Sequence, residues 1–184
     1  MLNIKEIEEN LIKKEAILDE LIKKNREIVR ITANSIKEMH AGNIDNAKIL
    51  LENAEAQIKI LSEKAQNHDM GINHNINHIM QEYAEAKLLF FAIEKKELPS
   101  STELGITPEA YLNALLDSIG EFKREMYESL RKGKKEDALY YFELMEIVYN
   151  ELLPFKFSNA LLPDFRRKQD VARIQIEQAR GELL

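Results

Sequence analysis

The chain has 184 residues, about the size of one domain, and contains only six glycines and four prolines. That is roughly half the average usage of these two helix-breaking residues, so the composition favours an all-helical protein. The formal charge of −6 excludes nucleic-acid binding through a global positive field; such binding must be local or assisted by a metal. The lack of cysteine excludes disulfides, thiolate catalysis, Cys-ligated zinc and iron–sulfur clusters.

The sequence also predicts the cellular location of the protein. The first ten residues, MLNIKEIEEN, mix charges of both signs, whereas a secretory signal places a basic region before an apolar stretch. The longest uninterrupted apolar run covers residues 88–93, far short of the ~20 residues that a membrane-spanning helix needs. We therefore expect a soluble, cytoplasmic protein that does not associate with a membrane.

The first half of the chain predicts three helices. Apolar residues recur at spacings of three, four or seven over residues 2–41, where neither glycine nor proline interrupts the pattern. Such a helix would be ~55 Å long at ~1.5 Å per residue, so part of it is expected to contact another subunit. Gly42 ends it, and further helices are expected over residues 44–65 and 75–96.

The second half begins with the main predicted loop. Residues 97–110, ELPSSTELGITPEA, contain two prolines and a glycine, and Thr107 followed by Pro108 is typical of a helix start. Helices are then expected over residues 108–132, 136–153 and 164–180. The prediction is one all-α domain over residues 1–184, a bundle of six or seven helices.

Four carboxylates are candidates for chemistry. Glu82 and Glu85 are three residues apart on one predicted helix, and Asp117 and Glu121 are four apart on the next, so each pair shares a helix face. Four ionised groups gathered in a bundle would repel one another unless a cation compensated them, and carboxylates without Cys or His ligands favour Mg²⁺ or Mn²⁺ over zinc. The alternative is two solvated acidic faces, since spacing does not show that the helices face each other.

Other polar and aromatic groups leave alternatives open. His78 shares a helix face with Glu82 and His74 lies one turn earlier, so they are either part of a mixed metal site or solvated histidines at a helix start. The aromatic cluster of the helix expected over residues 136–153 is either core packing, which we favour, or a stacking platform for unpaired bases; it comprises Tyr140, Tyr141, Phe142 and Tyr149.

Basic residues concentrate in two places. One is the turn over residues 131–135, and the other opens the last predicted helix, with Arg166, Arg167 and Lys168 followed by Arg173. Three adjacent cations at a helix N-terminus oppose the helix dipole, so they are not there to stabilise the helix. They indicate either contacts with a phosphate backbone or acidic partner, or salt bridges between subunits.

Three motifs together resemble the translin family. They are QEYAEA at residues 81–86, LGITPEAYLNALLDSIGE at 104–121 and LLPDFRRKQDVAR at 161–173, and the resemblance extends over nearly the whole chain. More narrowly, the chain resembles archaeal homologues of translin and translin-associated factor X. The resemblance implies a translin-like bundle of about seven helices that forms a homo-oligomer, commonly a hollow octamer, and binds single-stranded RNA or possibly single-stranded DNA.

The resemblance also implies a site and an activity. The factor X branch carries its catalytic carboxylates in the spacing of Glu82, Glu85, Asp117 and Glu121, all of which this chain retains. We therefore expect these four residues to hold Mg²⁺ or Mn²⁺ and to support endonucleolytic hydrolysis of single-stranded RNA. Local charge makes Arg166, Arg167, Lys168 and Arg173 candidate phosphate contacts. The alternative function is a single-strand-binding oligomer without catalysis.

Overall fold

The computed structural model describes residues 4–66 and 73–183, with side chains over residues 4–63 and 76–183. Seven α-helices and no strand make up the described chain, which confirms the all-α prediction. They are α1 (Ile4–His40), α2 (Ile44–Gln66), α3 (Asn73–Ile93), α4 (Ser101–Leu104), α5 (Pro108–Arg131), α6 (Lys135–Leu152) and α7 (Phe165–Leu183).

The short helix α4 lies inside the segment that the sequence predicted to be a loop. Its N-cap is Ser100, whose hydroxyl accepts a bond from the Glu103 amide, while the Glu103 carboxylate accepts a bond from the Ser100 amide. Gly105 ends it in the left-handed conformation, with φ of 63°. One turn of helix has too few apolar positions to show a period, so only its caps could have signalled it.

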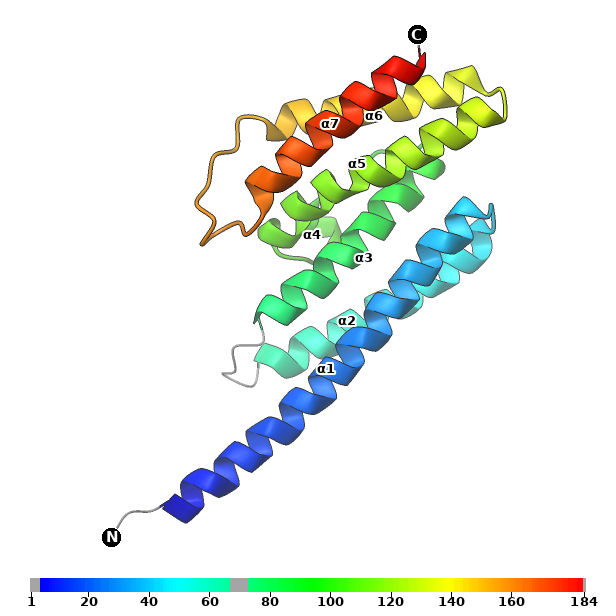
Figure 1. Cartoon of the computed structure of the whole chain (residues 1–184). Coiled ribbons are helices and arrows are strands. Elements are labelled where there is room, and N and C mark those ends of the chain that lie inside the picture. Colours follow the sequence, from blue (N-terminus) through cyan, green and yellow to red (C-terminus); the bar gives the residue numbers. More distant parts are fainter. Residues whose placement is uncertain (1–3, 67–72, 184) are drawn as a thin grey trace.

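The helices form two antiparallel hairpins with α3 between them (Figure 1). Helices α1 and α2 pack together on one side, α5 and α6 on the other, and α3 contacts α1, α2 and α5. Helix α7 packs back onto α5 and α6. Gly42 and Gly133 make the two hairpin turns with φ of 81° and 72°, a conformation that favours glycine.

Helix α5 is the centre of the bundle because it contacts α3, α6 and α7. Thr107 caps it by accepting a bond from the Ala110 amide, and Pro108 occupies the first turn as predicted. Its buried stripe includes Leu116, Ile119, Phe122 and Met126. The polar residues between these positions therefore face α3 and α7 at the edges of the core.

Helix α1 changes character along its length. Leu21, Ile28 and Met39 in its C-terminal half are buried against the bundle. The N-terminal half projects beyond the other helices (Figure 1), and its apolar residues are exposed: Ile4, Ile7, Leu11 and Ile12 are each about 60% accessible. The predicted long helix is confirmed, and its projecting half carries an apolar face that no described part of this chain covers.

Two smaller predictions can also be compared with the structure. Tyr141 is buried, and Tyr140, Phe142 and Tyr149 pack against the same core, which confirms core packing for this aromatic cluster. Among the helices described here, none is both long and apolar enough to cross a membrane.

Candidate active site

Three helices bring acidic and basic side chains to one pocket. Its volume is about 330 Å³, and its polar lining comprises Glu82 and Glu85 from α3, Asp117 from α5, and Arg167, Lys168 and Gln175 from α7. The helical spacing of each acidic pair places it on one face, and packing of α3 against α5 turns those two faces toward each other. Glu121 does not line the pocket, although its charge acts on Glu85.

Glu85 is the acidic residue with the most perturbed environment in this pocket. Burial raises the pKa of its carboxyl to about 8, and repulsion from Asp117, Glu82 and Glu121 adds to the effect, while Lys168 opposes it. All four predicted acids therefore interact electrostatically at one place. Glu85 has no hydrogen bond or ion pair with any residue described here, so only the more distant charge of Lys168 favours its ionised form.

Asp117, in contrast, has two direct partners. Lys168 Nζ lies 2.5 Å from Asp117 Oδ2, and Gln81 Nε2 donates to the same oxygen at 2.7 Å. The Lys168 and Asp117 side chains are only 15% and 26% accessible, so this ion pair is less screened by water than a surface pair. Of the four predicted basic residues, Lys168 is therefore the one that touches the acidic cluster.

A third feature, at the end of α1, was not predicted from the sequence. The ring of His40 sits between two carboxylates of α5, with Nε2 2.5 Å from Glu121 and Nδ1 2.5 Å from Glu125. Burial alone would lower the pKa of His40, but the hydrogen bonds to Glu121 and Glu125 outweigh it and raise the pKa to about 9. His40 is thus an imidazolium at neutral pH and fixes the orientation of Glu121.

The remaining predicted residues lie around the pocket without meeting at its centre. Arg166 and Arg173 are exposed, and Arg173 pairs with Glu177 at 3.3 Å. Arg167 lines the pocket and lies 3.4 Å from Asp164. His78 is 58% accessible and its Nδ1 lies 3.8 Å from Glu82, the arrangement of a solvated histidine beside the site. The side chain of His74 lies outside the described residues.

A second polar pocket adjoins the first and shares Arg167 and Lys168 with it. It also has a volume of about 330 Å³, and its lining includes the amide side chains of Asn77, Gln81 and Asn113. Asn113 is 6% accessible, and its Oδ1 has no hydrogen-bond partner among the described residues. The two pockets together form a polar groove along the N-terminal half of α5.

The donor chemistry of the acidic pocket fits a hard divalent cation. Its candidate ligands are carboxylate oxygens, which suit Mg²⁺ or Mn²⁺, and the chain has no cysteine that would favour zinc. The strongest observation for such an ion is that Glu85, a partly buried carboxyl beside three other acids, has no direct partner among the described residues. In the described part of the chain no three His, Asp or Glu side chains already converge at ligand distance; Asp117 is paired with Lys168, and Glu121 with His40.

Comparison with solved structures defines the class of protein. An AfC3PO–duplex RNA complex superimposes with a TM-score of 0.91 at 30% identity, over 99% of this chain and 95% of the other. AfC3PO in a second crystal structure gives a TM-score of 0.84 at the same identity and coverage. Apo-NeC3PO gives 0.89 at 27% identity, over 100% of this chain and 97% of the other. The fold is therefore the translin-like bundle of the C3PO structures.

Sequence comparison agrees with this class. No model of a known protein family matches the chain. The uncharacterized protein MJ0175 of Methanocaldococcus jannaschii is 30% identical over 176 residues, which cover 95% of this chain and 78% of that protein. With 30% identity to AfC3PO over nearly the whole length as well, the chain belongs to the translin/C3PO family.

Proposed function

We propose that this protein is an oligomeric RNA-binding protein of the C3PO type that hydrolyses single-stranded RNA endonucleolytically with Mg²⁺ or Mn²⁺. The observation that carries the proposal is that three other carboxylates lie around Glu85, close to the basic side chains of Arg167 and Lys168. Carboxylates that hold a metal cation, beside basic side chains that bind a phosphate, are the combination that phosphodiester hydrolysis needs. The RNA in one C3PO structure supports the choice of substrate class.

The roles of the residues follow from their positions. Glu82, Glu85 and Asp117 would hold the ion in the pocket, and Glu121, kept in place by His40, would complete the acidic set. When bound, such an ion supplies Lewis-acid polarisation of a phosphate oxygen and lowers the pKa of an attacking water. Glu85 is partly buried, and the lower local dielectric strengthens its interaction with any cation.

The basic residues would bind the RNA backbone. Arg167 lines both polar pockets and is exposed, so its guanidinium can reach a phosphate without leaving the site. Arg166 and Arg173 on the exposed side of α7 would extend this contact. Lys168 has a second role, because it compensates Asp117 until a metal ion binds.

Self-association is the part of the proposal that the projecting half of α1 supports. An exposed apolar face on a long helix is typical of an interaction surface, and the C3PO likeness favours a homo-oligomer, for which we propose an octamer. Light scattering measures the mass directly. Replacing Leu11 by Asp should reduce the mass, whereas Lys13→Asp, two residues along the same helix, is the control for added negative charge.

The test of function is cleavage of a labelled single-stranded RNA with Mg²⁺ or Mn²⁺, with EDTA, and with the double variant Glu82→Ala/Glu85→Ala. A matched control is Glu94→Ala/Glu97→Ala, which removes two exposed acids at the same spacing in the segment that follows the same helix. We expect cleavage by the wild type and the control, and none with EDTA or the site variant. Calorimetric titration with Mn²⁺ should show binding that only the site variant loses.

A non-catalytic RNA-binding oligomer is the alternative, and one observation favours it. Lys168 and His40 already neutralise Asp117 and Glu121, as in a site that has no need of a metal. If the wild type binds RNA but does not cleave it with either ion and does not bind Mn²⁺, this alternative is correct. Variants must keep the wild-type mass for any of these comparisons to count.

A further inference from the structure

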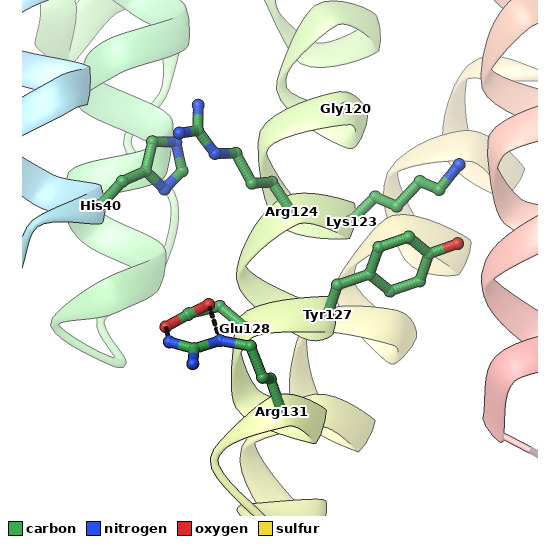
Figure 2. Close-up of a pocket in the computed structure, with 7 residues that line it drawn as sticks. All are labelled: His40, Gly120, Lys123, Arg124, Tyr127, Glu128 and Arg131. Carbon is green, nitrogen blue, oxygen red and sulfur yellow. Dashed lines mark hydrogen bonds and ion pairs between the residues drawn. The ribbon is translucent and has the colours of Figure 1, made fainter.

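The C-terminal half of α5 lines a larger pocket that the acidic site does not use (Figure 2). Its volume is about 490 Å³, and it lies between His40 at the end of α1 and the side of α5 that faces α7. Lys123, Arg124, Tyr127 and Arg131 line it, all from α5 at spacings that place them along one side of the helix.

Two cations in this pocket have no acidic partner. Arg124 is exposed and forms no ion pair with any residue in the described ranges. Lys123 Nζ contacts the neutral side-chain oxygen of Gln178 at 2.5 Å. Arg131, in contrast, is held by Glu128 through two bonds of 2.9 and 2.6 Å. The pocket therefore keeps an excess of positive charge in a chain whose net charge is −6.

Arg124 extends toward the ring of His40 (Figure 2), whose two nitrogens lie 2.5 Å from Glu121 and Glu125. These two carboxylates are therefore bonded to His40, while Arg124 forms no ion pair with any residue in the described ranges. The arrangement favours binding of an anionic group from outside the chain.

Tyr127 adds an aromatic surface to these cations. Its side chain is 37% accessible although it is large and apolar, and Lys123 Nζ lies 5.4 Å from its ring centroid. Figure 2 shows Lys123 and Tyr127 extending from α5 in the same direction. Cations beside an exposed aromatic ring are typical of surfaces where phosphates bind and an unpaired base stacks.

The pocket directly adjoins the acidic site. Gly120 lines it, and the Gln175 side chain, which lines the acidic pocket, would be 3.2 Å from a Cβ atom at Gly120. His40 lines the pocket and contacts Glu121 at 2.5 Å. Arg124 follows Asp117 by seven residues, ~10 Å along α5 at ~1.5 Å per residue. At ~3.4 Å per stacked nucleotide this distance spans about three nucleotides.

We propose that this pocket, hereafter the Arg124 pocket, binds a single RNA strand on the side of the acidic site opposite Arg167. Arg124 and Lys123 contact phosphates, and Tyr127 stacks on an unpaired base. The strand thus crosses the carboxylates between two basic surfaces, which places one phosphate over the acids. The inference rests on the RNA-binding part of the proposed function and does not require cleavage.

The test is binding of fluorescent single-stranded RNA measured by anisotropy in EDTA, so that cleavage does not interfere. The double variant Lys123→Gln/Arg124→Gln is compared with the control Lys48→Gln/Lys59→Gln, which removes two exposed lysines from α2. We expect the pocket variant to bind about tenfold more weakly. Its salt dependence, the slope of log K against log salt, should fall by about 1.4, because each phosphate contact on a single strand contributes ~0.7. The control should match the wild type.

Tyr127 supplies an independent readout. Tyr127→Ala should weaken single-strand binding about fivefold or more, the lower end of what base stacking contributes, while Tyr127→Phe keeps the ring and binds as the wild type does. A duplex of the same sequence has no free base face at this position, so Tyr127→Ala should leave duplex binding unchanged. A variant that merely unfolded the helix would lose both.

The outcomes separate this inference from the proposed catalysis. If the pocket variants lose affinity and the wild type never cleaves, RNA binding by the Arg124 pocket is confirmed and the proposed nuclease activity is wrong. If the wild type binds RNA and the pocket variants bind with the same affinity and salt slope, the inference is wrong while the proposed function remains. If the wild type binds no RNA of either form, both are wrong.

Discussion

The two ends of the acidic cluster differ in how their charges are balanced. At one end Glu121 and Glu125 enclose His40, so each carboxylate has a cation at 2.5 Å and the histidine pKa rises to about 9. At the other end Glu85 is partly buried among acids, and its own pKa rises to about 8. Both regions hold carboxylates in the same bundle, but the cation nearest to Glu85, Lys168, is bonded to Asp117 and not to Glu85.

This difference shows where the protein would gain most from binding an ion. A carboxyl with a pKa near 8 is mostly protonated at neutral pH, and a divalent cation would stabilise its ionised form. The His40 region has no such deficit and serves to fix Glu121. The predictions below test whether the two ends are as different as their surroundings indicate.

The largest effect is expected for Glu85→Gln on cleavage. The substitution keeps the shape of the side chain but removes the negative charge, so the rate of RNA hydrolysis with Mg²⁺ should fall about 1,000-fold, a loss of ~4 kcal/mol in transition-state stabilisation. Binding of RNA in EDTA should not change. Glu94→Gln is the control, since that carboxylate is exposed and lies directly after the last residue of α3. Equal cleavage rates for the two variants would contradict a role for Glu85.

The same variant should change how stability depends on pH. Because the folded pKa of Glu85, about 8, lies above the ordinary value of 4.5, the folded state binds the proton more tightly. Its contribution to stability is therefore greatest below pH 4.5 and decreases as pH rises toward 8. Urea unfolding of the wild type without divalent ions should show a loss of about 3 kcal/mol over this window, by 1.36 kcal/mol per pKa unit with allowance for partial solvent access. Glu85→Gln should remove most of that loss, and a wild-type curve that matches the variant's would contradict the assigned environment.

His40→Gln tests the balanced end. Since the folded pKa of His40 is raised from 6.5 to about 9, its stabilisation is complete below pH 6.5 and is lost as pH rises through 9. The variant should be less stable by about 2 kcal/mol at pH 6, because two partly buried carboxylates lose their cation, and the difference from wild type should disappear near pH 10. Urea unfolding at pH 6 and pH 10 measures this. A constant difference at both pH values would mean that His40 acts through packing and not through its charge.

Much of this architecture could be predicted from sequence, because it depends on local spacing. The period of α1, the proline at the start of α5 and the glycines of the two hairpin turns each act within a few residues. Spacing also placed each acidic pair on one face. What it could not show are the partners brought from distant helices, above all His40, which lies 81 residues from Glu121.

The basic residues show the same limit. The run of Arg166, Arg167 and Lys168 was recognisable as charge, but which of the three reaches the acids depends on how α7 docks on α5. Lys168 does, while Arg166 remains exposed. Lys123 and Arg124 lie between Glu121 and Glu125 on a predicted helix, without an excess of positive charge in the sequence, so the pocket that they share with Tyr127 is visible only once the helices have packed.

The smallest effect is expected for Lys168→Gln, which removes the cation beside Asp117. Without divalent ions the free energy of unfolding should fall by about 1 kcal/mol, since the pair is only partly screened and Gln81 remains bonded to Asp117. Lys96→Gln breaks an exposed pair with Glu94 and should have no measurable effect. Because the lost charge also leaves Glu85 less compensated, Mg²⁺ should stabilise Lys168→Gln more than it stabilises the wild type. Urea unfolding with and without Mg²⁺ compares the two, and equal stabilisation would show that Lys168 and a divalent ion do not share the acidic pocket.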